Sequence, residues 1–149
     1  MTTPGKSIRQ QIMEAYEDQL QTITTGAVYN TSLGSYIYED KDTPFADTAT
    51  LGLVYRDTNN TTAQTFGNQE HMLTVENLIL VVGTAAKKRQ VIADFVKCIG
   101  SNLTLGGLCE EISPISDEAV EGDHANKKAY WITIRIAIQY ITSNWNPYS

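Results

Sequence analysis

Residues Ala129 to Thr142 read AYWITIRIAIQYIT, with apolar residues at every second position. One face of it carries Tyr130, Ile132, Ile134, Ile136, Ile138 and Tyr140. The other face carries Trp131, Thr133, Arg135, Ala137, Gln139 and Ile141. A period of two indicates a β-strand with one apolar face. Fully extended, the strand spans about 45 Å, against a usual length of about 17–20 Å. A strand this long outgrows a small core, so we expect its far end to pair with another chain.

Two segments with helical periodicity lie upstream of this strand. Apolar residues recur every three or four positions from Lys6 to Ile23 and from Ala85 to Asn102, which predicts two amphipathic helices. Thr84 is the predicted N-cap of the second helix. The buried stripe of that helix is expected to contain Val91, Ile92, Phe95, Val96 and Ile99.

The segments around the helices are read as strands and loops. Extended structure is predicted at Ala27–Asn30, Ser35–Tyr38, Thr50–Arg56, His71–Val82 and Leu108–Ile115, where Pro114 favours an edge strand or a bulge. An acidic turn is expected at 39–42, closed by Pro44. The polar segment Asp57–Gln69, with Phe66 as its only large apolar residue, is a long loop or the tip of an extended hairpin. Ser116–Lys128 is read as a charged connection that leads by a hairpin into the terminal strand.

The order of these segments predicts one α+β domain over residues 1–149, with an extended tail from about residue 143. We expect a mostly antiparallel sheet with the two helices packed on one face. The net charge of −6 argues against a surface that grips nucleic acid, because such surfaces need clustered Lys and Arg. The start of the chain has no apolar signal core, and the longest aliphatic run, Leu78–Val82, is too short to cross a bilayer. We therefore expect the protein to be made and kept in a reducing cytoplasm, with both of its thiols free.

The ionisable residues form no recognisable catalytic or metal-binding motif. His71 and His124 lack further metal ligands at a suitable spacing, so both are read as surface histidines. Cys98 and Cys109 lack a C-x-x-C spacing, and Cys98 is read as a core thiol of the second helix. Acidic residues at 110–111 and 117–123 are read as solvated loops. The basic run Lys87–Arg89 is read as a solvated face or as a salt-bridging patch in an assembly. No catalytic, cofactor or metal residue is assigned.

Aromatic side chains are the remaining candidates for function. They fall on strand faces or in the tail, at Tyr36, Tyr38, Tyr55, Trp131, Trp145 and Tyr148. Tyr and Trp are favoured anchors of protein interfaces, although some can simply cover the second face of the sheet. We predict interface positions for Phe66, Trp131, Trp145 and Tyr148.

The layout of nearly the whole chain resembles the tail terminator proteins (minor tail or tail completion proteins) of long-tailed bacteriophages. The resemblance rests on the first helix, IRQQIMEAYEDQLQTI; the polar insertion Asp57–Gln69 before a long strand; the second helix, KKRQVIADFVKCIGSNL; the acidic hairpin loop; and a final strand that ends at Tyr140-Ile141-Thr142. These features are patterns of segment order and composition. The family offers no invariant motif residue that can be assigned to a position in this chain. The segment 27–56 departs from the simpler strand expected of the family.

The resemblance implies a virion protein that forms a homohexameric ring at the head-proximal end of the tail. Such a ring stops tube polymerisation and offers a surface to the head. Its partners are the tail tube protein, the connector or head-completion protein and, in contractile tails, the sheath protein. DNA passes through the lumen without specific binding, and neither an enzymatic activity, a cofactor nor a membrane is expected. Two alternatives stay open: another phage ring protein of the tube or head completion, and a small cytoplasmic α+β enzyme or ligand-binding module.

Overall fold

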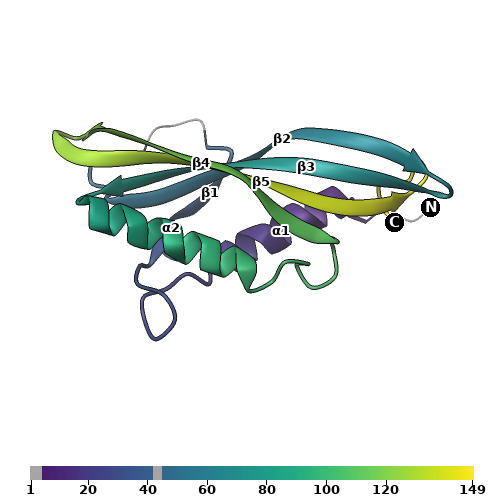
Figure 1. Cartoon of the computed structure of the whole chain (residues 1–149), viewed down its shortest axis with the longest axis horizontal. Coiled ribbons are helices and arrows are strands. Elements are labelled where there is room, and N and C mark those ends of the chain that lie inside the picture. The colour runs from purple at the N-terminus through teal and green to yellow at the C-terminus, as the bar shows by residue number, and fades with distance from the viewer. Residues whose placement is uncertain (1–4, 42–44) are drawn as a thin grey trace.

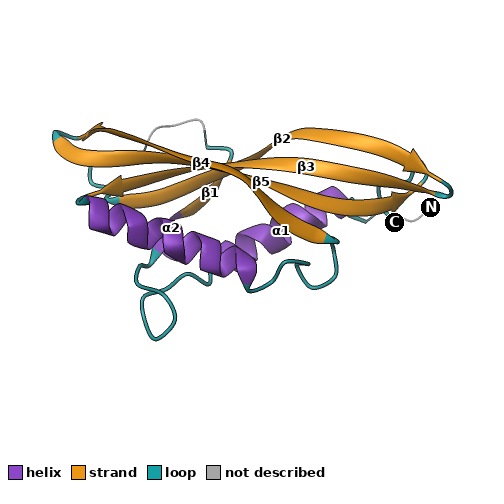
Figure 2. Ribbon diagram, viewed as in Figure 1, coloured by secondary structure: helices purple, strands orange, loops and turns teal. Residues whose placement is uncertain are grey.

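The computed structural model of the chain describes residues 5–41 and 45–149. Its elements follow the order α1 (Ile8–Leu20), the 3-10 helix η1 (Leu33–Tyr36), β1 (Ile37–Glu39), β2 (Leu51–Thr65), β3 (Asn68–Val82), α2 (Ala85–Gly100), β4 (Glu111–His124) and β5 (Lys127–Ser143). Within these residues the strands form one twisted sheet in the order β1-β2-β3-β5-β4. Both α-helices lie on one face of it (Figures 1 and 2), which confirms the α+β prediction.

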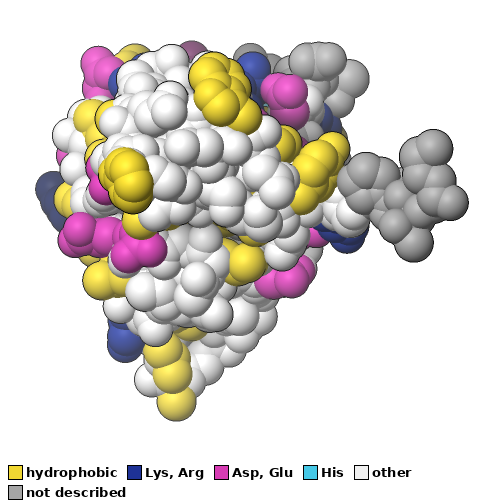
Figure 3. Space-filling view, turned by 90° about the vertical axis from the view of Figure 1, so that its right-hand side faces the viewer, with side chains coloured by type: hydrophobic (Ala, Val, Ile, Leu, Met, Phe, Trp, Pro, Cys, Tyr) yellow, Lys and Arg dark blue, Asp and Glu magenta, His cyan; other side chains and the backbone are white. Residues whose placement is uncertain are grey.

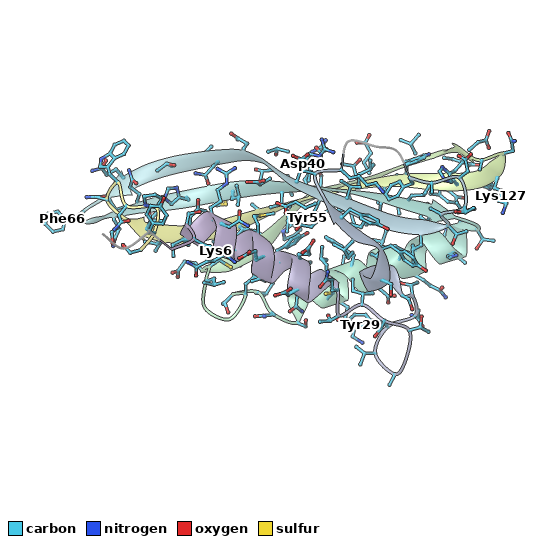
Figure 4. All side chains as sticks on the ribbon, turned by 180° about the vertical axis from the view of Figure 1, so that it is seen from behind. Lys6, Tyr29, Asp40, Tyr55, Phe66 and Lys127 are labelled. Atoms are coloured by element: carbon cyan, nitrogen blue, oxygen red, sulfur yellow. The ribbon has the colours of Figure 1, made fainter. Side chains whose placement is uncertain are left out.

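Two long antiparallel hairpins, β2–β3 and β4–β5, make up most of the sheet. They are joined because β3 pairs antiparallel with β5 along the full length of β3. Among the strands that the structure describes, only β1 runs parallel to its neighbour, through three residue pairs with β2. The hairpin turns lie at opposite ends of the molecule, as the labels of Phe66 and Lys127 show (Figure 4).

The polar segment Asp57–Gln69 belongs to the β2–β3 hairpin. Of the two alternatives, the extended hairpin is confirmed and the long loop is wrong, because only Phe66 and Gly67 lie between the strands. A register shift between Asp57 and Asn59 interrupts the ladder once. Backbone pairing needs no apolar side chains, and Thr is favoured in strands. The segment therefore continues the sheet without contributing to the core.

The charged segment Ser116–Lys128 was wrongly predicted as a connection. Most of it is β4, which continues to His124 and turns into β5 through Ala125 and Asn126. Both turn residues have positive φ, 51° and 65°, as a type I′ turn requires. The register of β4 shifts between Pro114 and Ser116, so the edge or bulge expected at Pro114 is confirmed.

The segment between α1 and β2 is less regular than predicted. The expected strand Ala27–Asn30 is wrong, because these residues form turns held by the buried carboxylate of Asp94 on α2. That carboxylate accepts hydrogen bonds from the backbone N–H groups of Asn30 and Thr31 and from the Thr31 hydroxyl. Ser35–Tyr38 is divided between η1 and β1. The acidic turn at 39–42 and Pro44 lie partly outside the described residues.

Both helices are shorter than predicted and begin at side-chain caps. Ser7 Oγ accepts from the Gln10 N–H at the start of α1, and Thr84 Oγ1 accepts from the Lys87 N–H at the start of α2, which confirms the Thr84 cap. A buried hydrogen bond of 2.6 Å joins Tyr16 Oη on α1 to Asn77 Oδ1 at the centre of the sheet. Such a bond satisfies polar groups that would be costly to bury alone.

The main core lies between the helices and one face of the sheet. The apolar face of β5 is buried from Tyr130 to Tyr140, so the expectation that this strand outgrows the core is wrong. β3 pairs with it up to Ser143 and β4 up to Gln139, so within the described residues little of its far end is left to pair with another chain. Ile134 and Ile136 belong to the same cluster as Val91, Phe95 and Ile99 of α2. The fold therefore depends on β5, which contributes core residues and pairs with both neighbouring strands.

A smaller cluster covers part of the opposite face of the sheet. Phe45 packs with Val54, Leu80 and Ala129, and Trp131 lies against this cluster. The chain has glycine at position 52 where the Phe45 ring approaches, because a Cβ there would overlap the ring. The helices cover one face of the sheet, and this cluster covers part of the other face.

Candidate interaction surfaces

The outer part of the β2–β3 hairpin, residues 58–69, carries no charged side chain; we call it the neutral tip. Most of its side chains are exposed hydroxyl or amide groups. Phe66 stands fully exposed at the turn. Figure 3 views this end of the molecule, where hydrophobic side chains stand apart on a largely uncharged surface. An exposed aromatic ring on a long two-stranded support is a candidate anchor for another protein.

The base of the neutral tip is held by a hydrogen-bonded group around His71. The ring of His71 stacks on Tyr140, with 4.5 Å between centroids. Its Nε2 lies 2.8 Å from Thr142 Oγ1, and its Nδ1 lies 3.1 Å from Thr62 Oγ1. Partial burial, followed by the nearby Arg9 charge, lowers the pKa of His71. The histidine thus connects β2, β3 and β5 at the point where the hairpin leaves the core.

The C-terminal residues fold back beside this hairpin, which corrects the expected extended tail. The Trp145 N–H donates to Gln69 Oε1 at 3.2 Å, and the Ile8 N–H donates to the Pro147 carbonyl at 2.8 Å. Trp145 is 82% exposed and has a φ of 56°, which is costly for a bulky residue. Tyr148 is also exposed. These two side chains extend the aromatic character of this end of the molecule.

A hollow of about 350 Å³ lies between the neutral tip, the start of α1 and the C-terminal turns. Its lining consists of Ser7, Arg9, Asn60, Gln69, His71, Tyr140, Thr142, Trp145 and Pro147. Arg9 is engaged by Asp57, with 2.6 Å between Nη2 and Oδ2. Asn60, Gln69, His71, Tyr140 and Thr142 are joined to one another or to the tail by hydrogen bonds, and Arg9 links α1 to β2 through Asp57. These contacts fasten the hairpin to α1 and to the tail.

The outer part of the β4–β5 hairpin, residues 117–128, has the opposite character; we call it the charged tip. It carries four acidic residues, Asp117, Glu118, Glu121 and Asp123, and two basic ones, Lys127 and Lys128. Lys128 Nζ lies 3.3 Å from Glu121 Oε1 across the strands. Such exposed pairs contribute little stability, but the charges keep this end of the sheet hydrated.

Trp131 lies near the charged tip, on the sheet face opposite the helices. It is partly buried, and its ring contacts Phe45 and His124, with centroid distances of 6.2 and 5.9 Å. His124 Nε2 lies 2.8 Å from the Ala46 carbonyl oxygen. These contacts account for the packing of Trp131 within one chain. Its placement at an interface stays a prediction, as do those of Phe66, Trp145 and Tyr148.

Both edges of the sheet keep long unpaired stretches. β1 covers only Leu53 to Tyr55 of β2, so among the described residues no strand pairs with the outer side of the segment 57–65. β4 forms the opposite edge over its whole length. A free strand edge presents backbone donors and acceptors to a neighbouring chain.

An apolar groove lies between α2 and the sheet, with a volume of about 180 Å³. Its lining residues are Phe95, Val96, Ile99, Gly100, Leu103, Ile112, Pro114, Ile134 and Ile136. Val96 was predicted to be buried, and this prediction is wrong: it is 59% exposed at the rim. The groove is open between the C-terminal half of α2 and the start of β4, where Ile112 and Pro114 line it. No pattern in the sequence predicts this groove.

Both cysteine side chains are buried. Cys98 is buried and its Sγ donates to the Gln19 carbonyl at 3.0 Å, as expected for a core thiol. Burial raises the pKa of the Cys109 thiol to about 11, so its thiolate is scarce at neutral pH. Within residues 5–41 and 45–149, no three His, Cys, Asp or Glu side chains gather as a metal site.

Comparison of the sequence with protein-family models finds no match, and comparison with curated proteins finds none either. None of the described helices has the length and apolarity needed to span a membrane. The surfaces described above are therefore the basis for a functional proposal.

Proposed function

We propose that this chain is the subunit of a ring at the head-proximal end of a bacteriophage tail, where it stops tube polymerisation and joins the tail to the head. One observation carries the proposal: the sheet extends past its helices in two hairpins and keeps free edges on both sides (Figure 1). Free strand edges on two sides give a subunit two different surfaces with which it can bind its neighbours.

The charge on β4 favours a ring over a twofold dimer. An antiparallel pair of β4 strands centred on Val120 would place Asp117 of each copy opposite Asp123 of the other. Like charges directly opposite one another destabilise a sheet. The outer edge of β2 carries no charge from Thr58 to Thr65 and is a better partner for β4. Pairing of two different edges is heterologous, and heterologous contacts that close form rings.

The acidic balance of the chain also suits this role. A ring through which DNA passes must not retain it, and a net charge of −6 opposes binding to phosphates. The expected partners are further copies of the chain, the tail tube protein and the connector or head-completion protein. Binding to these partners requires no cofactor.

The decisive experiment removes the protein from the phage that encodes it. Tails are expected to fail to join heads, and many should grow beyond the normal length, because nothing caps the last tube ring. Purified protein added to such tails should cap them without nucleotide, metal or small molecule, and negative-stain images of the capped end should show a ring. Native mass spectrometry should detect a cyclic species, with six copies expected.

Three outcomes would contradict the proposal. Head-joined tails of normal length in the deletion phage would exclude a terminator. Complete absence of tails would indicate a tube or initiator protein. A stable dimer at all concentrations, without larger species, would exclude the ring.

A further inference from the structure

Phe66 is an apolar group without an apolar environment. It is fully exposed at the turn of the β2–β3 hairpin, and the twelve residues of the neutral tip around it include no charge. The hairpin is paired up to Thr65 and Asn68, so the ring stands on an ordered support. Binding of the ring therefore costs side-chain entropy but little backbone entropy.

The apolar groove is the complementary feature. Its floor is formed by core side chains, including Phe95, Ile99 and Ile136, and its rim by the exposed Val96 and by Leu103. Its lining holds no charged or hydrogen-bonding side chain. It therefore fits an uncharged apolar group and disfavours a charged one.

The two features lie apart in one molecule. The hairpin turn is at one end of the long axis, whereas α2 lies in the other half of the molecule (Figure 1). Phe66 points away from the domain at the far end (Figure 4). Phe66 and the groove can therefore meet only between copies.

The charge of the two hairpin tips indicates which of them can insert into the apolar groove of a neighbouring copy. The charged tip would bring four acidic residues toward a groove whose edge strand β4 already begins with Glu111 and continues with Asp117 and Glu118. The neutral tip brings none. We infer that Phe66 of one copy inserts into the apolar groove of the next copy, as a head-to-tail contact. This contact deepens the proposed ring and rests on it for closure.

The area involved sets the strength of the contact. One aromatic side chain buries about 150–250 Å². A stable interface buries about 1,200–2,000 Å² in total. The Phe66 contact cannot hold two copies together alone, so it acts together with the strand edges. We expect weak association of free copies and firm engagement in a closed ring.

Cysteine cross-linking tests the contact. Two tagged variants, Phe66→Cys and Val96→Cys, are mixed and oxidised, both free in solution and on capped tails. The native thiols are buried and remain in both variants. The matched control replaces Val96→Cys with Val120→Cys, because Val120 is 58% exposed, close to the 59% of Val96, but lies on the charged tip. The Phe66–Val96 pair should give at least about tenfold more mixed disulfide than the control pair.

A second set of variants measures assembly. Phe66→Asp should abolish ring formation and tail capping, and Phe66→Leu should retain both. Both variants should melt at the temperature of the unmodified protein, because Phe66 makes no contacts within the fold.

Each outcome separates the contact from the proposed function. Cross-linked open chains without tail capping would support the contact and refute the terminator role. Rings that cap tails without a Phe66–Val96 disulfide, or with an equal Phe66–Val120 yield, would overturn the contact and leave the role intact. Neither rings nor the disulfide would overturn both.

Discussion

The β2–β3 and β4–β5 hairpins are alike in construction and opposite in surface chemistry. Both project from the same core, with strands of 14 to 17 residues and loops of two residues. The neutral tip is rich in hydroxyl and amide groups and ends in Phe66. The charged tip carries acids and lysines and turns through Ala125 and Asn126.

This difference shows that hairpin length and hairpin function are set separately. Length comes from backbone pairing, which continues wherever β-compatible residues face one another. The side chains of the tip then determine which other chains it can pair with. Charges on an edge strand oppose unwanted pairing, and a neutral tip lacks that protection. We therefore propose that the neutral tip supplies the docking side chain, whereas the charges on β4 restrict its pairing to an uncharged partner edge.

The largest expected effect concerns β5, which belongs to the β4–β5 hairpin and pairs with β3 of the other hairpin. Ile134→Ala or Ile136→Ala should each lower the free energy of unfolding by about 2–5 kcal/mol, through lost burial and a residual cavity. Both side chains are almost fully buried beside α2. Denaturant unfolding followed by circular dichroism measures the loss.

The control for this prediction is Val120→Ala, an apolar truncation on the exposed charged tip. Its effect should stay within about 0.5 kcal/mol, as for surface substitutions generally. An equal decrease in the free energy of unfolding for Val120→Ala would show that the charged tip contributes to the core. The tip and the base of the hairpin would then not differ in their contribution to stability.

The turns give a smaller effect with opposite signs in the two hairpins. Gly67 has a φ of 84° and Ala125 a φ of 51°, and an L side chain in this region costs about 1–2 kcal/mol. Gly67→Ala should therefore destabilise the β2–β3 turn, whereas Ala125→Gly should stabilise the β4–β5 turn. Thermal unfolding of the two variants should shift in opposite directions. Shifts of the same sign would mean that one turn differs from its described conformation.

The sequence predicts the elements that build the core better than it predicts the tips. The terminal strand was predicted as Ala129–Thr142 and is found as Lys127–Ser143, because a strand with one buried face alternates visibly. The stripe of α2 was likewise legible at Phe95 and Ile99. Where one face of a helix or strand is buried, its apolar residues recur with a regular period, and that period predicts the element from the sequence.

The tips could not be read in this way, because their side chains face water on both sides. Ser116–Lys128 shows no apolar alternation, and its strand character arises from pairing with β5. The exposure of Val96 depends on how α2 lies over the sheet, which no local pattern encodes. The aromatic candidates were found by residue type, whereas the groove required the fold.

The smallest predicted effect distinguishes the single histidine of each hairpin, His71 at the base of the neutral tip and His124 at the end of β4. The pKa of His71 is lowered in the fold by partial burial and by Arg9, below the ordinary value of 6.5. As pH falls through about 6.5 the unfolded chain gains a proton that the folded chain resists, so stability declines with acidification. Above that pH the contribution is fully present.

His71→Gln should flatten this decline below about pH 6.5, since glutamine does not titrate. The measurement is the midpoint of urea unfolding at a series of pH values. His124→Gln serves as the matched control, because it removes the other histidine and leaves the stack on Tyr140 intact, so the His71 contribution must persist. The same pH profile for the unmodified protein and His71→Gln would show that the neutral tip is not fastened through a neutral imidazole. A profile flattened only in His71→Gln would place the acid-sensitive attachment at the base of the hairpin that carries Phe66.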